Sequence, residues 1–178
     1  MRPLLHKFDE RIKKIVDRWP ANARFVMQFA TTIGQPVFTV GISVFAIGLG
    51  WNGANSALMY SGIIALTVLV LSTIIKLLLK RSRPLTEYVT RMWMKTYSLP
   101  SGHAVGAIAS YGLVGYVVSR PLVGIEAIAS LLFFTLIIAM IGISRIYLGA
   151  HYATDVVAGW LLGGVALVII VGVLQPTL

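Results

Sequence analysis

Two long apolar runs enclose a short polar segment in the C-terminal part of the chain. They read GIEAIASLLFFTLIIAMIGI at residues 124–143, SRIYLGAHYATD at 144–155 and VVAGWLLGGVALVIIVGVL at 156–174. Each apolar run has about the 20 residues that a helix needs to cross roughly 30 Å of hydrocarbon. Arg145, His151 and Asp155 lie between the runs, where ionisable side chains are costly and usually mark a functional site. The stretch therefore predicts two membrane helices with a polar site at their junction.

The composition extends this interpretation to the whole chain. Of the 178 residues, 57% are hydrophobic and 12% are charged, whereas a soluble domain carries about 25% charged residues. No polar linker divides the chain, so we expect one all-α integral membrane domain over residues 1–178. Its five predicted membrane spans are Phe25–Leu49, Ser56–Leu79, Ser101–Val118, Gly124–Ile143 and Val156–Leu174.

Residues 3–19 predict an amphipathic helix that lies on the membrane surface. Leu4, Phe8, Ile12 and Ile15 recur at helical spacing, and cations occupy the other faces. The alternative is a partly ordered basic tail, and in either case the segment 1–24 precedes the bundle. We expect the helix to lie beside the polar site, where it would help to admit lipid head groups.

The net charge of +9 indicates a lipid partner rather than a nucleic acid. The cations lie in the N-terminal segment and in the stretch Lys76–Lys95, and both adjoin predicted spans. Anionic lipid surfaces or phosphorylated head groups are the simpler partners for cations so placed. The chain has no cysteine, which excludes disulfides and thiol chemistry.

Alternation of the five spans brings three polar groups to one side of the membrane. Lys76 and Arg83 lie at the end of the second span, Ser101–His103 opens the third, and Ser144–Asp155 joins the fourth to the fifth. Lys76 and Arg83 offer charge and a planar fork of donors to phosphate oxygens. Ordinary snorkelling to the interface explains such cations equally well, and it is our interpretation of Lys80 and Arg81.

Each of the two histidine-containing groups has a structural and a catalytic interpretation. Ser101 suits a helix N-cap and Gly102 permits close approach to backbone amides, so His103 is either an interfacial histidine or a proton donor at an anion site. His151 and Asp155 share a face if the chain is helical there, and the carboxylate would then orient the imidazole for attack. Thr154 or Asp155 as a simple N-cap is the alternative. Two histidines and one carboxylate among cations make a poor metal site, so we expect no metal and no other cofactor.

Taken together, the three groups have a specific order and spacing. Lys76-x6-Arg83-Pro84, Pro100-Ser101-Gly102-His103 and Ser144-Arg145-x5-His151-x3-Asp155 resemble the three-part signature of the type 2 phosphatidic acid phosphatase (PAP2) superfamily. The resemblance implies a metal-independent membrane lipid phosphatase with a phosphohistidine intermediate. In that mechanism His151 is the nucleophile, Asp155 orients it and His103 protonates the leaving oxygen. The phosphoryl oxygens are held by Lys76, Arg83, Ser101, Gly102 and Arg145.

The resemblance leaves the substrate and two rival functions open. Candidate substrates are undecaprenyl diphosphate, phosphatidylglycerophosphate, phosphatidic acid and the 1-phosphate of lipid A. The rivals are a vanadate-dependent haloperoxidase, which shares the signature, and a non-enzymatic binder or transporter of lipid phosphates. Typical bacterial members have six spans, and here the amphipathic segment stands in place of the first.

The orientation of the site in the membrane is predicted from two conflicting rules. The family's site usually faces the periplasm or the exterior, whereas the positive-inside rule favours the cytoplasm because the cation-rich N-terminus lies on the same side as the site. Several of those cations are explained by catalysis. We therefore expect a bacterial plasma-membrane protein with an outward site, and the sequence leaves its oligomeric state open.

Overall fold

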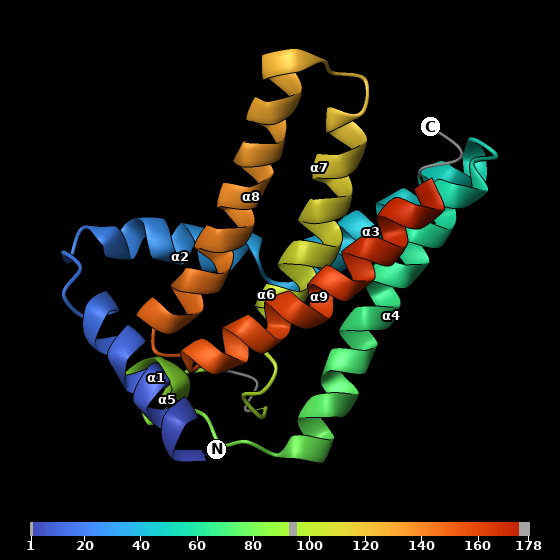
Figure 1. The fold of residues 1–178 in the computed structure, drawn as a ribbon. Coiled ribbons are helices and arrows are strands. Elements are labelled where there is room, and N and C mark those ends of the chain that lie inside the picture. The colour runs from blue at the N-terminus through green and yellow to red at the C-terminus, as the bar shows by residue number, and fades with distance from the viewer. Residues whose placement is uncertain (1, 93–95, 175–178) are drawn as a thin grey trace.

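The computed structural model describes residues 2–92 and 96–174, and these residues form helices without any strand. Met1, residues 93–95 and residues 175–178 lie outside the described part, and with them the ends of the predicted domain and Lys95 of the basic stretch. The helices are α1 (Arg2–Val16), α2 (Ala23–Ile33), α3 (Pro36–Asn52), α4 (Ser56–Leu79), α5 (Glu87–Thr90), α6 (Gly102–Gly106), the π-helical turn η1 (Ala107–Tyr111), α7 (Gly112–Ser119), α8 (Gly124–Tyr147) and α9 (Ala153–Leu174) (Figure 1).

The long helices have the length and the surface of membrane helices. Among the described residues, α4, α8 and α9 are each long and apolar enough to cross a membrane. Large apolar side chains on their outer faces remain exposed, among them Leu78 at 74% and Val168 at 73%. Exposed apolar surface of this extent is favourable only against lipid. The bounds of α4 coincide with the predicted second span.

The predicted first span, Phe25–Leu49, is not one straight helix. It consists of α2 and α3, which meet at a bend of 40°. Pro36 is the first residue of α3 and forces the preceding Gln35 into an extended conformation, so α2 has to end before it. Gly34 lets the bend lie against α8, because a Cβ there would be 2.4 Å from Cγ2 of Ile141. Gly34 and Pro36 are residues that permit a kink, whereas the close contact with Ile141 cannot be read from the sequence.

The core of the bundle is built from small side chains. The helix α9 packs against α4 and α6, and α3 packs against α4. Ala65, Ala109 and Ala166 are among the buried residues that line these contacts. Small residues let membrane helices approach closely, which replaces the hydrophobic driving force that lipid removes. A second cluster, which includes Val16, Ala104 and Val156, ties α1 to the bundle.

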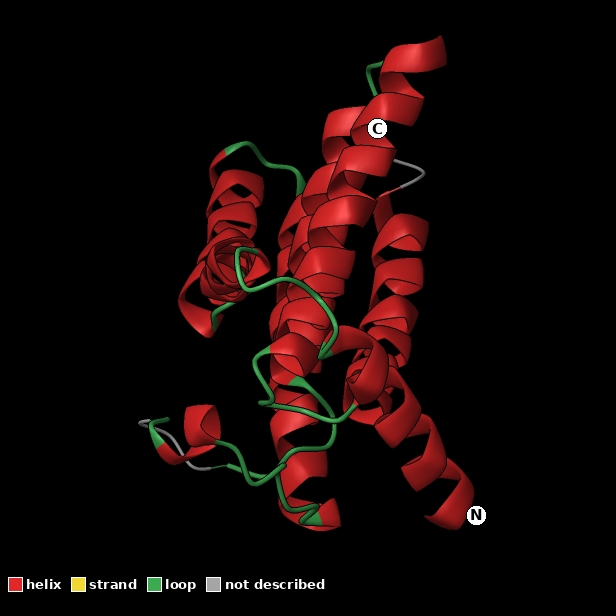
Figure 2. Cartoon of the chain, turned by 90° about the vertical axis from the view of Figure 1, so that its left-hand side faces the viewer, coloured by secondary structure: helices red, strands yellow, loops and turns green. Residues whose placement is uncertain are grey.

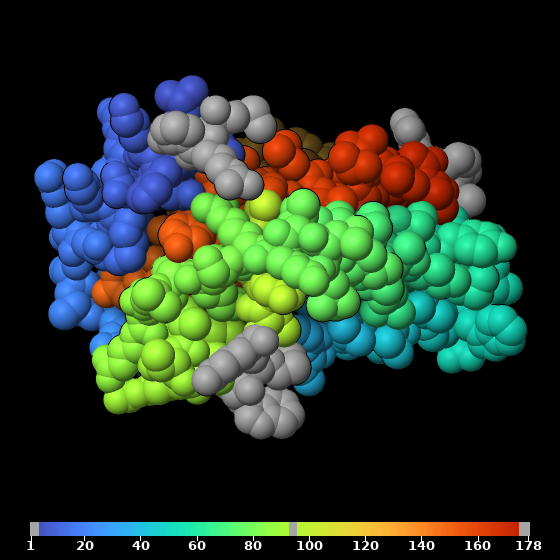
Figure 3. All heavy atoms as spheres, turned by 90° about the horizontal axis from the view of Figure 1, so that it is seen from below, coloured from blue at the N-terminus to red at the C-terminus, as the bar shows by residue number. Residues whose placement is uncertain are grey.

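The polar groups collect at one end of the bundle. The end of α4, the start of α6, the end of α8 and the start of α9 lie in the lower part of Figure 1. Figure 2 shows the N-terminus and the long loop after α4 at this same end. Seen from below, α1, the loop after α4 and the α8–α9 connection lie next to one another (Figure 3). This is the arrangement that alternation of spans predicts.

Replacing Gly163 with alanine should lower the unfolding temperature in detergent. The added Cβ would lie 2.8 Å from the backbone oxygen of Val105, so α9 would have to move away from α6. Overpacking of this kind costs about 1–3 kcal/mol. Gly164→Ala is the matched control, since a Cβ there has nothing within 4 Å and alanine favours a helix. Equal unfolding temperatures for the two variants would contradict the tight contact.

Candidate active site

A cleft of about 540 Å³ brings together most of the predicted site residues. They come from three stretches of the sequence, which are Lys76–Arg83, Gly102–His103 and Arg145–His151. Its polar lining includes Lys76, Arg83, Gly102, His103, Arg145 and His151. Ser101 and Asp155 are fully buried and do not line the cleft. The backbone N–H of Ser101 donates to the backbone oxygen of Asp155 at 2.9 Å, so the two lie next to each other behind it.

Arg83 and His151 are in direct contact. Nη1 of Arg83 lies 3.1 Å from Nε2 of His151 and donates to the backbone oxygen of Ala150 at 2.9 Å. Thr96 fixes the same guanidinium through its backbone oxygen and its hydroxyl. Because an arginine only donates, Nε2 has to be the acceptor, and the proton of a neutral His151 is then on Nδ1. The lone pair of Nε2 therefore lies on the side of Arg83.

Burial and neighbouring cations keep His151 neutral. His151 is 3% exposed. Burial lowers the pKa of His151 well below the usual 6.5, and the charges of Arg83, Arg145 and Lys76 lower it further. The pKa of Arg83 is lowered as well, first by burial and then by Arg145, but an arginine keeps its charge. A neutral imidazole keeps the lone pair on Nε2 that a protonated ring would lose.

Asp155 lies in the first turn of α9, next to both Tyr152 and His151. Its Oδ2 accepts a hydrogen bond from the backbone N–H of Tyr152 at 2.9 Å, which caps the helix in the manner of a capping box. The same oxygen is 3.4 Å from Nδ1 of His151, and Nδ1 makes no closer hydrogen bond within the described residues. Asp155 thus caps the helix from its third position rather than from the N-cap position, and its role toward His151 stays a prediction.

Arg145 lies inside α8, which runs four residues beyond the predicted end at Ile143. It is 2% exposed, and its Nη1 donates to the hydroxyls of Thr31 and Tyr88. The guanidinium also lies 5.5 Å from the centre of the Tyr88 ring. Its Nε has no partner among the described residues. Neutral groups thus hold this cation at the cleft, and at least one of its donors is unused.

The start of α6 carries the remaining predicted residues. Ser101 is at the N-cap position, yet its hydroxyl makes no capping bond, and no partner for Oγ lies in the described part of the chain. A Cβ on Gly102 would lie 3.1 Å from Nζ of Lys76, so glycine allows the lysine to approach this helix end. No side-chain hydrogen bond involves Lys76 or His103 in the part that the structure describes.

The interpretation of Arg81 as a snorkelling cation is wrong. Its side chain is 28% exposed, and its Nη1 and Nη2 each lie 2.7 Å from a carboxylate oxygen, of Asp155 and of Asp9 respectively. No local sequence pattern indicates these pairs, because Asp9 is 72 positions away on α1. Asp9 is seven residues before Val16, so the two share a face of α1, but only the structure shows that this face is buried. Lys80, by contrast, is exposed.

Residues 56–177 match the sequence profile of the PAP2 superfamily. This region contains all three polar groups, from Lys76 to Asp155. The chain belongs to the PAP2 superfamily. It is 27% identical over 129 residues to phosphatidylglycerophosphatase B of Bacillus subtilis (strain 168), which covers 71% of this chain and 60% of that protein. It is 34% identical over 104 residues to undecaprenyl-diphosphatase of Sulfolobus acidocaldarius, which covers 53% of this chain and 44% of that protein. The chain therefore spans about half the length of these curated relatives.

Two solved structures share the fold. A transmembrane PAP2-type phosphatidylglycerolphosphate phosphatase from Bacillus subtilis superposes with a TM-score of 0.82 at 23% identity, over 98% of this chain and 88% of that one. LpxE of Aquifex aeolicus superposes with a TM-score of 0.65 at 17% identity, over 92% of this chain and 93% of that one. With the apolar helices, this likeness identifies an all-helical integral membrane protein.

NMR of the histidine side chains in detergent should find His151 neutral at pH 6.5. An ordinary histidine is half protonated there, but burial and three cations favour the neutral form of this one. Arg83→Gln removes one of those charges, so the pKa of His151 should rise and the ring should take up its proton at a higher pH. The chain has three histidines, and His151→Ala assigns the signal. A half-protonated His151 at pH 6.5 in the parent would contradict this electrostatic account.

Proposed function

We propose that this PAP2 protein is a lipid phosphatase that removes a terminal phosphate from a membrane lipid, with His151 as the nucleophile. The observation that carries the proposal is the contact between Nε2 of His151 and Nη1 of Arg83 at the cleft. The Arg83 donor holds the ring so that the lone pair of Nε2 faces the position where a phosphate would bind. A phosphate oxygen would take over the Arg83 donor, and Nε2 would then be free to attack the phosphorus.

The proposed reaction has two steps. In the first, Nε2 of His151 forms a bond to phosphorus, the bond from phosphorus to the lipid oxygen breaks, and His103 gives that oxygen a proton. In the second, water attacks the phosphohistidine, the P–N bond breaks, and His103 takes the proton of the water. Lys76, Arg83 and Arg145, with Ser101 and Gly102 beside them, stabilise the charge of the transferred group. Asp155 orients His151 and stabilises its positive charge in the intermediate.

The proposed reaction uses no metal ion. Lys76, Arg83 and Arg145 all line the cleft and supply the positive charge that a divalent cation supplies in other phosphatases. The same cations repel a divalent ion. Activity should therefore persist in the presence of a chelator.

Lipid substrates fit the cleft better than soluble ones. Val40, Leu69, Val70 and Leu77 line the same cleft as the cations. These residues lie on α3 and α4, so apolar and cationic walls face one space, as a lipid with a phosphorylated head group requires. The names of the relatives favour phosphatidylglycerophosphate and undecaprenyl diphosphate. With phosphatidic acid and lipid A 1-phosphate, these form the panel of candidate substrates.

We further propose one domain with five spans and a surface helix. The bent pair α2–α3 forms the first span, and α6, η1 and α7 together form a helical segment of 18 residues, long enough for another. The exposed Leu4 and Phe8 on α1 support its position at the lipid surface. The protein would lie in a bacterial plasma membrane with its site facing outward.

His151→Ala should abolish phosphate release from every lipid phosphate in the panel, with and without EDTA. His6→Ala is the matched control, because His6 is an exposed histidine on α1 that pairs with Glu10. It should retain the rate of the parent. Acid-quenched parent enzyme should carry labelled phosphate that His151→Ala lacks. Parental activity in His151→Ala would rule out attack by this histidine.

Reporter fusions at the C-terminus test the orientation. With five spans, the C-terminus lies on the side opposite to the site, so an outward site predicts a cytoplasmic C-terminus. A cytoplasmic fluorescent reporter fused there should be active, and a periplasmic alkaline phosphatase reporter should be inactive. The reverse pattern would place the site in the cytoplasm, as the positive-inside rule predicts.

A further inference from the structure

The helix α1 contributes a buried carboxylate next to the proposed nucleophile. Asp9 is 5% exposed, although its neighbours Phe8 and Glu10 are exposed. Its Oδ1 accepts a hydrogen bond from the backbone N–H of Thr154 at 2.8 Å, and its Oδ2 accepts one from the Thr154 hydroxyl at 2.9 Å. The N–H of Thr154 belongs to the first turn of α9, where a helix cannot satisfy its own donors. Asp9 therefore caps α9 from a different helix.

Arg81 joins this carboxylate to the carboxylate of Asp155. Its Nη2 donates to Oδ2 of Asp9 and its Nη1 to Oδ1 of Asp155, both at 2.7 Å. Nη1 also donates to the Thr154 hydroxyl, and the guanidinium lies 4.3 Å from the centre of the Tyr152 ring. Both Nη atoms of the guanidinium are thus hydrogen-bonded, and one of its faces lies against the Tyr152 ring.

The contacts continue to His151. The second oxygen of Asp155 accepts from the N–H of Tyr152 and lies 3.4 Å from Nδ1 of His151. We propose that Asp9 and Arg81 are positioning residues for phosphoryl transfer: Asp9 fixes Arg81, and Arg81 holds the Asp155 carboxylate where it meets His151. This inference rests on the proposed function, since it assigns a role relative to His151 as nucleophile.

The role follows from what His151 needs during the reaction. When Nε2 bonds to phosphorus, the imidazole becomes a cation, and Nδ1–H then requires a carboxylate at hydrogen-bond distance. In the resting structure that distance is 3.4 Å, so a small displacement of Asp155 decides whether the bond forms. Arg81 sets the position of Asp155 through their hydrogen bond. Asp9 binds the other side of the guanidinium and so prevents Arg81 from moving together with Asp155. Two carboxylates around one guanidinium also leave a net negative charge on the Nδ1 side of the ring.

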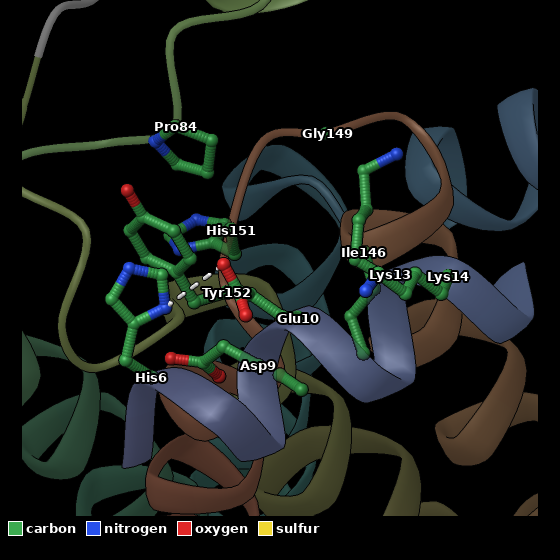
Figure 4. Close-up of a pocket in the computed structure, with 11 residues that line it drawn as sticks. His6, Asp9, Glu10, Lys13, Lys14, Pro84, Ile146, Gly149, His151 and Tyr152 are labelled. Atoms are coloured by element: carbon green, nitrogen blue, oxygen red, sulfur yellow. Dashed lines mark ion pairs between the residues drawn. The ribbon is translucent and has the colours of Figure 1, made fainter. Parts of the chain in front are cut away.

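The polar contacts of Asp9 join α1 to the start of α9 beside a cavity. Figure 4 shows α1 crossing the α8–α9 turn, with His6, Asp9 and Glu10 beside Tyr152 and His151. A cavity of about 240 Å³ lies between the helix and the turn. At this cavity the bonds of Asp9 to Thr154 and Arg81 join α1 to the start of α9, whereas apolar packing joins them further along α1, at Ile12 and Val16.

The test is the steady-state rate of four variants on the lipid phosphate that the parent hydrolyses fastest. Asp9→Asn and Arg81→Gln should lower kcat by about 10- to 100-fold, the loss expected when a charge-assisted hydrogen bond is removed, with KM nearly unchanged. Arg81→Lys should fall as far as Arg81→Gln, because one ammonium cannot bridge two carboxylates as a planar fork does. Glu10→Gln, which removes the same charge from an exposed position on α1, should keep the kcat of the parent.

The unfolding temperature of each variant separates positioning from folding. Rates are measured well below it, on protein that elutes as a single species, and the phosphohistidine formed in one turnover is counted. Positioning predicts a slower rate of phosphohistidine formation in fully folded Asp9→Asn. A parental kcat in Asp9→Asn, a parental kcat in Arg81→Lys, or a loss that equals the unfolded fraction would each overturn the inference.

The result also separates this inference from the proposed function. If His151→Ala hydrolyses the lipid as the parent does, the proposed function fails and the inference fails with it. If His151→Ala is inactive and Asp9→Asn has the kcat of the parent, only the inference fails.

Discussion

The carboxylate of Asp155 is fully buried at the start of α9, and three other parts of the chain contact it or its backbone. Arg81 from the loop after α4 binds one oxygen, and the N–H of Tyr152 from the α8–α9 turn binds the other. Ser101 at the start of α6 donates to the backbone oxygen of the same residue. A buried ion is tolerated only when its partners are in place, and removing one partner leaves a costly unpaired charge. The loops therefore cannot rearrange without exposing Asp155, and the site and the fold at this end depend on one group.

The cations of the cleft, unlike Asp155, have no partner of opposite charge among the described residues. Arg83 and Arg145 are held by neutral groups, and within the described residues none of Lys76, Arg83 and Arg145 forms an ion pair with a carboxylate. Their mutual repulsion in a partly buried site is offset when a ligand with negative charge enters. The same field explains why His151 is neutral and why its lone pair faces a donor. The proposed affinity for phosphate and the neutral state of His151 thus have one electrostatic origin.

The sequence predicted those features that repeat or that stand close together along the chain. Apolar runs gave the bounds of α4 and the approximate ends of α8 and α9, because a span needs a fixed number of residues. Alternation of spans predicted that Lys76, His103 and His151 would meet, and all three line one cleft. The roles of these residues stay predictions.

Features that depend on contacts between distant helices were not predictable in this way. The close contact of Gly34 with Ile141 depends on the approach of α8, and the burial of Asp9 depends on Arg81 and Thr154. Arg81 looks like any cation at a membrane surface until α1 is in place. An isolated pattern on one helix does not say which helix will cover it, so the sequence could not distinguish Arg81 from the exposed Lys80.

The two faces of α1 connect the lipid surface with the site. Leu4 is 71% exposed and Ile15 is 49% exposed on one side, whereas Asp9 and Val16 are buried on the other. Exposed apolar side chains on a short helix are favourable at a bilayer surface, and the buried carboxylate is favourable only against Arg81 and the first turn of α9. Both conditions apply to one rigid element of 15 residues. Moving α1 away from the bundle would therefore expose apolar surface of Val16 and leave Arg81 with a single carboxylate, so the position of α1 and the geometry at Asp155 change together.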